Sequence, residues 1–146
     1  MVPLDKFVDR VVASGVLSAS LCEFPPPAAL AEIQRAELRM GQRVPESLRS
    51  LLCRWNGVNL DVLRLLPCET MEARDEGLYF ANDPAGFMYF LDSSGAVVML
   101  NADGGDLKVV ASDLSDLLTG YIFGARARAF AGEEWARELA AAGLAT

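Results

Sequence analysis

The sequence contains no histidine and only two lysines, Lys6 and Lys108. Histidine is the usual general base of enzymes and the commonest metal ligand in proteins, so its absence argues against both roles. Neither lysine stands in a recognisable serine–lysine motif, and Cys53 has no base that could activate its thiol. We therefore expect no catalytic residue, no metal and no cofactor, and hence no enzymatic activity.

Cysteine is also scarce, with Cys22, Cys53 and Cys68 at irregular spacings. An odd count without a Cys-x-x-Cys pair favours neither a zinc site nor a disulfide framework. We expect three buried and reduced thiols, which are typical of a protein in a reducing cytoplasm.

No apolar run approaches the roughly 20 residues that a membrane-spanning helix needs. Residues 11–22 are fairly apolar, but Asp5 and Asp9 balance the basic residues beside them, whereas an export signal begins with a net positive charge. Phe7 and Val11 instead share one face of a helix. The sequence therefore predicts an ordinary amphipathic helix at the amino terminus of a soluble, cytoplasmic protein.

The excess of negative charge is concentrated in the middle of the chain. The net charge is −7, and residues 51–125 carry four basic and eleven acidic side chains. Such a segment repels nucleic acids and anionic membranes and attracts basic proteins. Carboxylate pairs at 75–76 and 103–106 have a spacing that acid–base catalysis could use, but aspartate is also common in turns of this kind. The alternative explanation of the charge is solubility alone.

Periodicity and turn residues predict one α+β domain, and the length of 146 residues fits a single domain. A helix is predicted at residues 27–40 and ends at Gly41, and Pro45 opens a second helix. The apolar stripe of that second helix comprises Leu48, Leu51, Leu52 and Trp55. Strands are predicted at 63–66, 78–81, 86–91, 96–100 and 107–110, and further helices at 114–122 and 133–142. The short connections between the strands allow hairpins only, so the sheet is predicted to be mostly antiparallel and flanked by helices.

Three short motifs follow one another along the chain: E-x-x-M-G-x-x-V-P-E at residues 37–46, N-G at 56–57 and F-A-x-D-x-x-G-x-x-Y at 80–89. Their joint order and spacing resemble the SUKH superfamily, which comprises the Smi/Knr fungal cell-wall regulators and many bacterial relatives. The resemblance spans residues 27–120. It leaves helical extensions at 1–26 and 121–146, which we expect to pack on the same domain. The family-motif residues, for which we expect structural roles, are Glu37, Gly41, Pro45, Trp55, Asn56, Gly57, Asp83 and Gly86.

The resemblance implies a function in protein binding. Bacterial members of the superfamily are mostly regarded as immunity proteins that neutralise a cognate toxin, often a nuclease or a deaminase, and the family has no established catalytic activity. We therefore expect an acidic antitoxin whose partner is a basic toxin domain. The alternative is an intracellular regulatory or scaffold protein of the Smi/Knr type. A third hypothesis is a small-molecule binder that uses a cleft between sheet and helices.

The acidic middle segment provides the predicted contact residues. Charge would speed the encounter with a basic partner, while aromatic anchors would supply most of the affinity. The predicted contact acids are Glu69, Glu72, Asp75, Glu76, Asp92, Asp103 and Asp106. If these acids serve solubility only, the alternative binding surface is the C-terminal segment with Tyr121, Phe123, Phe130 and Trp135.

Overall fold

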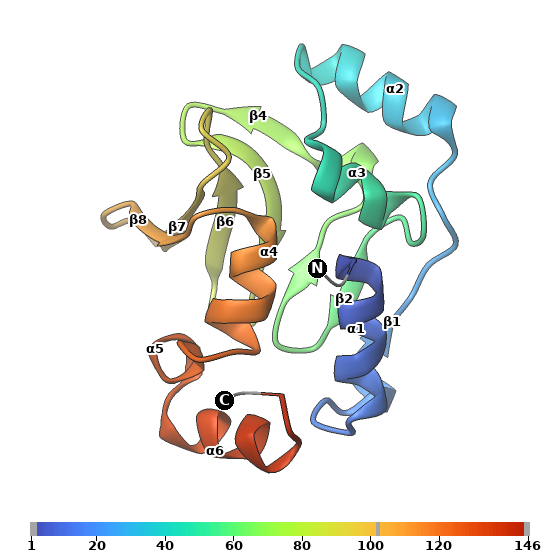
Figure 1. Cartoon of the computed structure of the whole chain (residues 1–146). Helices are drawn as coiled ribbons and strands as arrows, with labels where there is room; N and C mark the ends of the chain where they lie inside the picture. Colours follow the sequence, from blue (N-terminus) through green and yellow to red (C-terminus); the bar gives the residue numbers. More distant parts are fainter. Residues whose placement is uncertain (1–2, 102, 145–146) are drawn as a thin grey trace.

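An antiparallel β-sheet forms the centre of the molecule (Figure 1). A computed structural model of the chain describes residues 3–101 and 103–144. Within these residues the sheet has eight strands in the order β1-β2-β3-β5-β6-β7-β8, with β4 paired to β5. The strands are β1 (Cys22–Glu23), β2 (Val58–Leu60), β3 (Arg64–Leu65), β4 (Glu72–Arg74), β5 (Gly77–Asn82), β6 (Phe87–Leu91), β7 (Val97–Asn101) and β8 (Lys108–Ala111). Each pairing between described strands is antiparallel, as the short connections predicted.

Helices from the N-terminal and C-terminal parts of the chain surround this sheet. The α-helices are α1 (Leu4–Ala13), α2 (Leu30–Met40), α3 (Glu46–Leu52), α4 (Leu114–Asp116), α5 (Ala127–Ala131) and α6 (Glu133–Ala141). Short 3₁₀ helices are η1 (Ala19–Leu21) and η2 (Cys68–Thr70), and η3 (Leu117–Ile122) is a π-helix. Helix α3 contacts α1 and α4, whereas α5 and α6 lie together at the opposite end from α2 (Figure 1). The predicted α+β class is therefore confirmed.

The hydrophobic core lies between the sheet and the helices that contact it. Leu48, Leu51 and Leu52 of α3 are each at most 2% exposed, so three of the four residues of the predicted stripe are buried. Helix α1 buries Phe7 and Val11 in the same cluster. The amphipathic helix predicted at the amino terminus thus forms and packs on the domain.

Helix α2 begins three residues later than predicted, at Leu30 rather than at residue 27. The prolines before it remain extended, and their backbone is bound elsewhere. Ala28 donates its N–H to the carbonyl oxygen of Leu52 at 2.9 Å, and the Pro26 carbonyl accepts the N–H of Asn56 at 2.9 Å. Since these bonds hold the proline segment against the end of α3, the first helical turn can form only after it.

The strands and helices that the sequence did not predict are all short. β1, β2 and β4 have two or three residues each, and α5 has five, which is too few to produce a recognisable periodicity. The single helix predicted at 114–122 is instead one α-turn followed by the π-helix η3. A Cβ atom on the following Gly124 would collide with the carbonyl group of Thr119, so glycine is needed where the chain turns back.

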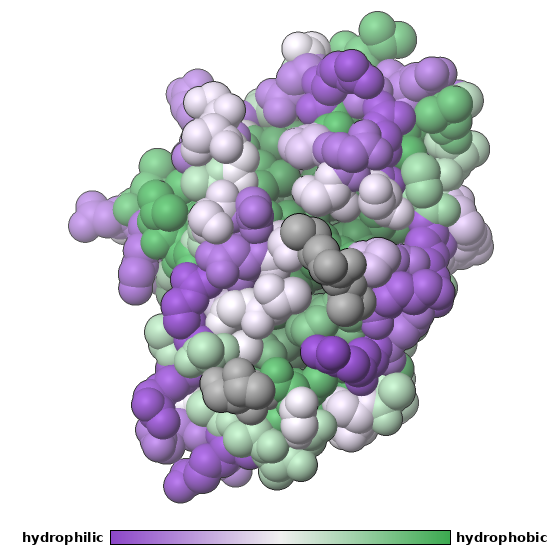
Figure 2. All heavy atoms as spheres, viewed as in Figure 1, coloured by the Kyte–Doolittle hydropathy of each residue, from purple (hydrophilic) through white to green (hydrophobic). Residues whose placement is uncertain are grey.

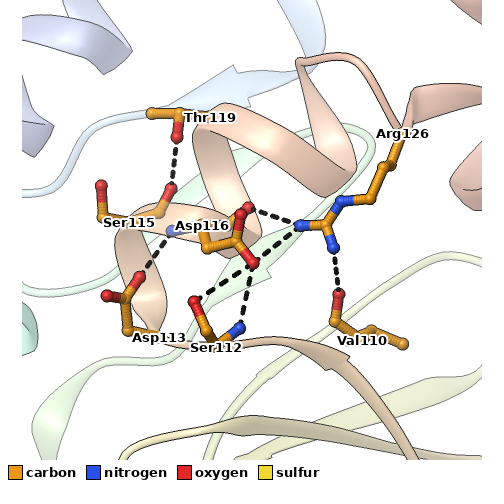
Figure 3. A network of polar contacts seen from close by, with 7 residues as sticks. All are labelled: Val110, Ser112, Asp113, Ser115, Asp116, Thr119 and Arg126. Carbon is orange, nitrogen blue, oxygen red and sulfur yellow. Dashed lines mark hydrogen bonds and ion pairs between the residues drawn. The ribbon is translucent and has the colours of Figure 1, made fainter.

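Both terminal extensions are bonded to the domain. At the amino terminus, β1 joins the sheet beside β2, and Arg54 binds the carboxylate of Asp9 at 2.6 Å. At the carboxy terminus, Arg126 donates to the Asp116 carboxylate at 2.8 Å and to the Val110 carbonyl at 3.2 Å (Figure 3). Arg126 therefore ties the segment after η3 to edge strand β8.

Candidate functional site

The seven predicted contact acids lie in a short helix, a short strand and the hairpin connections of the sheet. Glu69 lies in η2 and Glu72 in β4, while Asp75 and Glu76 lie at the β4–β5 turn. Asp92 lies in the β6–β7 turn, and Asp103 and Asp106 lie in the β7–β8 connection. Residue 102, within the turn at 101–106, falls outside the described residues.

Three of these acids already have local partners. Glu69 accepts a hydrogen bond from the Asn56 amide at 3.0 Å, and Glu76 forms an ion pair with Arg74 at 3.8 Å. Asp92 accepts bonds from the Ser94 hydroxyl at 2.6 Å and from backbone N–H groups of its own turn. These bonds, the Ser94 hydroxyl foremost, lower the pKa of Asp92.

The other four acids are exposed, and none makes a side-chain hydrogen bond or ion pair within residues 3–101 and 103–144. They are Glu72, Asp75, Asp103 and Asp106. These are the acids that can meet a partner without first breaking an internal contact.

The hairpin acids fall into two groups at opposite ends of the sheet. Gly77 follows the β4–β5 turn and begins β5, and a Cβ added to it would touch Leu91 and Asp92 at the end of β6. The β4–β5 turn and the β6–β7 turn therefore lie at the same end of the sheet. The β7–β8 connection follows Asn101, which pairs with Phe87 at the far end of β6. A five-residue strand separates the ends by about 16 Å. The structure therefore does not bring all seven acids into one patch.

The first family motif forms the corner between α2 and α3. Glu37 accepts the N–H of Val44 at 2.8 Å and a bond from the Arg49 guanidinium at 2.6 Å. Burial disfavours the ionised carboxylate, but these two donors together outweigh burial and lower the pKa of Glu37. Gly41 ends α2 with a φ of 71°, and Pro45 is the residue before α3. Each of these motif residues shapes the corner itself.

The N-G motif connects α3 to the segment that leads into the sheet. Asn56 accepts the N–H of Cys68 at 2.9 Å and donates to Glu69, so one side chain links the end of α3 to η2. Gly57 has a φ of 88°, and an added Cβ would lie 2.7 Å from the backbone nitrogen of Pro67. Glycine is therefore required at 57 both by conformation and by space.

The third motif builds the β5–β6 turn around Asp83. Its Oδ1 atom accepts the N–H groups of Ala85 at 3.0 Å and Phe87 at 3.1 Å, and its Oδ2 atom accepts the hydroxyl of Tyr89 at 2.7 Å. Gly86 turns with a φ of 92°. Burial and these contacts raise the pKa of Tyr89, which therefore stays protonated as a donor.

Trp55, the last residue of the predicted apolar stripe, lies at the border of the core rather than inside it. Helix α3 ends at Leu52, so Trp55 lies beyond it, and the indole is half-buried at the border of the core. Its ring lies 5.2 Å from that of Phe24, and the Arg54 guanidinium stacks 4.2 Å above it. The apolar stripe therefore extends beyond the helix onto an aromatic pair at the border of the core, with Trp55 half-buried and Phe24 39% exposed.

The cysteines also differ from the expectation that all three are buried. Cys68 is buried, Cys22 is half-buried and Cys53 is exposed, and all three are free thiols. Burial raises the pKa of Cys68 to about 11, so this thiol is unreactive at neutral pH.

A groove of about 420 Å³ opens between the sheet and the C-terminal segment. Sequence reasoning named two of its lining residues, Tyr121 and Phe130, as part of an alternative binding surface, but it did not identify the sheet residues that face them. Its apolar walls come from β6, β7, η3 and α5, and Asp83 and Lys108 provide the charged groups. The main apolar side chains are those of Phe87, Tyr89, Met99, Tyr121 and Phe130. The sequence signal for this wall was the alternation of Phe87 and Tyr89 with Met88 along one predicted strand. The sequence did not show which helix faces that strand.

The four C-terminal aromatic residues divide between the core and this groove. Phe123 is 1% exposed, and Trp135 is buried with its indole N–H donated to the Ile122 carbonyl at 2.8 Å. Tyr121 and Phe130 pack edge to face with ring centres 5.5 Å apart and line the groove. Only this second pair is available to a ligand.

The comparisons with known proteins agree with this architecture. The model of the SMI1 / KNR4 family (SUKH-1) matches residues 27–120, from the proline segment into η3. The match covers well over half of the chain, and the protein belongs to this family. No curated protein matches the sequence. No described helix has the length and apolar character that crossing a membrane requires.

Proposed function

We propose that this chain is a non-catalytic protein-binding domain and that its partner is a basic toxin domain, which it neutralises in the bacterial cytoplasm. The observation that carries the proposal is the group of exposed acids Glu72, Asp75, Asp103 and Asp106, without internal partners among the described residues, on a member of the SUKH-1 family. Unpaired surface carboxylates accelerate association with a basic protein and help to select it.

Three further observations support a binding role rather than chemistry. The sequence has no histidine. Within residues 3–101 and 103–144, no three side chains of the metal-ligating types converge on one point. The carboxylates of Asp83 and Asp92 are occupied by hydrogen bonds that shape their own turns.

The test is capture of the partner with two matched baits. The first bait replaces Glu72, Asp75, Asp103 and Asp106 by lysine. The control bait makes the same change in net charge at exposed acids elsewhere, at Glu23, Glu46, Glu134 and Glu138. Wild-type and control baits are expected to retain the same basic protein from a native-cell extract, identified by mass spectrometry, and the first bait is expected to lose it.

Co-expression then tests neutralisation directly. The captured protein should arrest growth when it is produced alone and should lose that effect when this chain is produced with it. A captured protein that is harmless by itself would instead favour the alternative, a regulatory or scaffold role of the Smi/Knr type. Equal capture by all three baits would refute the contribution of the four acids.

A further inference from the structure

The groove between the sheet and α5 contains a polar group that its surroundings leave unused. Tyr121 is 5% exposed, yet its hydroxyl makes no hydrogen bond to any of the described residues. The same side chain lines the groove beside Phe130. No side-chain oxygen or nitrogen of the described residues is both buried and without a partner, so the Tyr121 hydroxyl itself reaches the open space of the groove. The Tyr121 hydroxyl is therefore placed to bind a group that enters the groove.

The chemistry of the walls defines what can enter. Phe87, Met99 and Phe130 offer apolar and polarisable contacts, which suit an aromatic ring. Burial and the nearby charge of Asp83 raise the pKa of Tyr121, so its hydroxyl stays neutral and can both donate and accept. The carboxylate of Asp83 on the same wall already accepts three hydrogen bonds, so what it offers a ligand is its negative charge, which disfavours an anionic group beside it.

The surroundings of the groove point to a protein as the source of that ring. Lys108, which lines the groove, begins β8, and the connection just before it carries the exposed Asp103 and Asp106. Leu107 and Val109 on the same edge strand are 50% and 63% exposed. In Figure 2 hydrophobic side chains reach the surface on the side where Figure 1 shows β7 and β8. A basic polypeptide could therefore contact these acids while one of its side chains fills the groove.

We infer that the groove receives a tyrosine or tryptophan side chain of the protein partner, with the Tyr121 hydroxyl bonded to its polar atom. This inference rests on the proposed function and specifies where the affinity comes from. Acids on the hairpins accelerate the encounter, and an aromatic ring in a pocket provides the anchor that typically dominates binding energy at protein interfaces.

The groove can be tested without the partner by NMR titration of the full chain with N-acetyl-tyrosinamide and N-acetyl-phenylalaninamide. The tyrosine probe is expected to shift the signals of Phe87, Met99 and Phe130 and to bind more tightly than the phenylalanine probe. Tyr121→Phe should weaken the tyrosine probe by about five-fold, the effect of one hydrogen bond, and leave the phenylalanine probe unchanged.

Steric blocking provides the second variant. Ala129→Trp places a large side chain on α5 at the groove lining, and Ala140→Trp places the same side chain on the exposed surface of α6. Ala129→Trp should abolish probe binding, whereas Ala140→Trp should not. Equal affinity of the two probes for the wild type, shifts confined to other residues, or binding that survives Ala129→Trp would each overturn the inference.

The same two variants serve as baits in the capture experiment, where the two hypotheses can fail separately. Loss of the captured protein with Ala129→Trp but not with Ala140→Trp is the expected result. If both variants retain the protein, the groove assignment is wrong while protein binding stands. If the wild-type chain retains no basic protein, the proposed function fails, and the probe titration alone then decides whether the groove accepts an aromatic donor.

Discussion

The two tryptophans of the chain provide a direct test of how this fold distributes its stability. Trp135 is 8% exposed, its indole N–H donates to the Ile122 carbonyl at 2.8 Å, and its ring lies 6.0 Å from that of Phe123. Trp55 is half-buried, and its indole nitrogen makes no hydrogen bond among the described residues. Substitution by phenylalanine keeps an aromatic ring at each position and removes the N–H.

At position 135 the change should be costly. It leaves the buried Ile122 carbonyl without its donor, which costs about 1–3 kcal/mol, and it opens a small cavity where the larger indole was packed. We expect Trp135→Phe to lower the free energy of unfolding by about 2–3 kcal/mol. For a chain of this size that corresponds to a fall in Tm of roughly 5–10 °C.

At position 55 the same change should be nearly neutral, within about 0.5 kcal/mol, as for most surface substitutions. Urea unfolding followed by circular dichroism measures both variants. Tryptophan fluorescence confirms which indole remains, because the buried Trp135 emits at a shorter wavelength than the half-exposed Trp55. A loss at position 55 equal to or greater than that at position 135 would refute this account and would make Trp55 the stronger anchor of the core.

Three further predictions concern the family corner, a glycine and the acids. The pKa of Glu37 is lowered in the fold from a reference value of 4.5, so its stabilising effect is present above about pH 4.5 and is lost as the pH falls through the lower folded-state value. Glu37→Gln should therefore reduce stability at pH 7 and flatten the acid limb of a stability-versus-pH curve, and an unchanged limb would contradict this. Gly57→Ala should cost at least about 2 kcal/mol in urea unfolding because of backbone strain and collision, and should exceed the cost of Gly41→Ala, where an added Cβ meets open space. Reversing Asp75 and Glu76 to lysine should slow association with the partner and reduce its salt dependence in stopped-flow measurements while Tm barely changes. Equal association rates at low and moderate salt would mean that these two acids only aid solubility.

The elements that could be predicted are those whose signal lies within a few residues. The stripe of Leu48, Leu51 and Leu52 repeats with the helical period, and the strands β5 to β8 are separated by turn clusters. Gly41 was predicted to end a helix because glycine adopts positive φ without strain, and its φ is 71°. Each of these features depends on local geometry, which sequence spacing reports directly.

Features that depend on distant partners could not be predicted in the same way. Trp55 continues the helical stripe in the sequence, but α3 ends at Leu52, and Asn56 just beyond Trp55 donates its N–H to the Pro26 carbonyl of a distant segment. The aromatic residues of the C-terminal segment look equivalent in the sequence. Their division into core and groove depends on where η3 meets the sheet, with Trp135 bonded inward and Phe130 facing the groove.

By itself the sequence determined the fold class, the antiparallel sheet, the family and the acidic character of the middle segment, because composition, periodicity and motif order are properties of the chain. Only the tertiary structure decided which acids remain unoccupied, that the hairpin acids lie at two ends of the sheet, and that the largely buried Tyr121 presents its hydroxyl to an apolar groove. The physical reason is that burial and hydrogen bonding depend on the distances between segments far apart in the chain. No local pattern of residues specifies those distances.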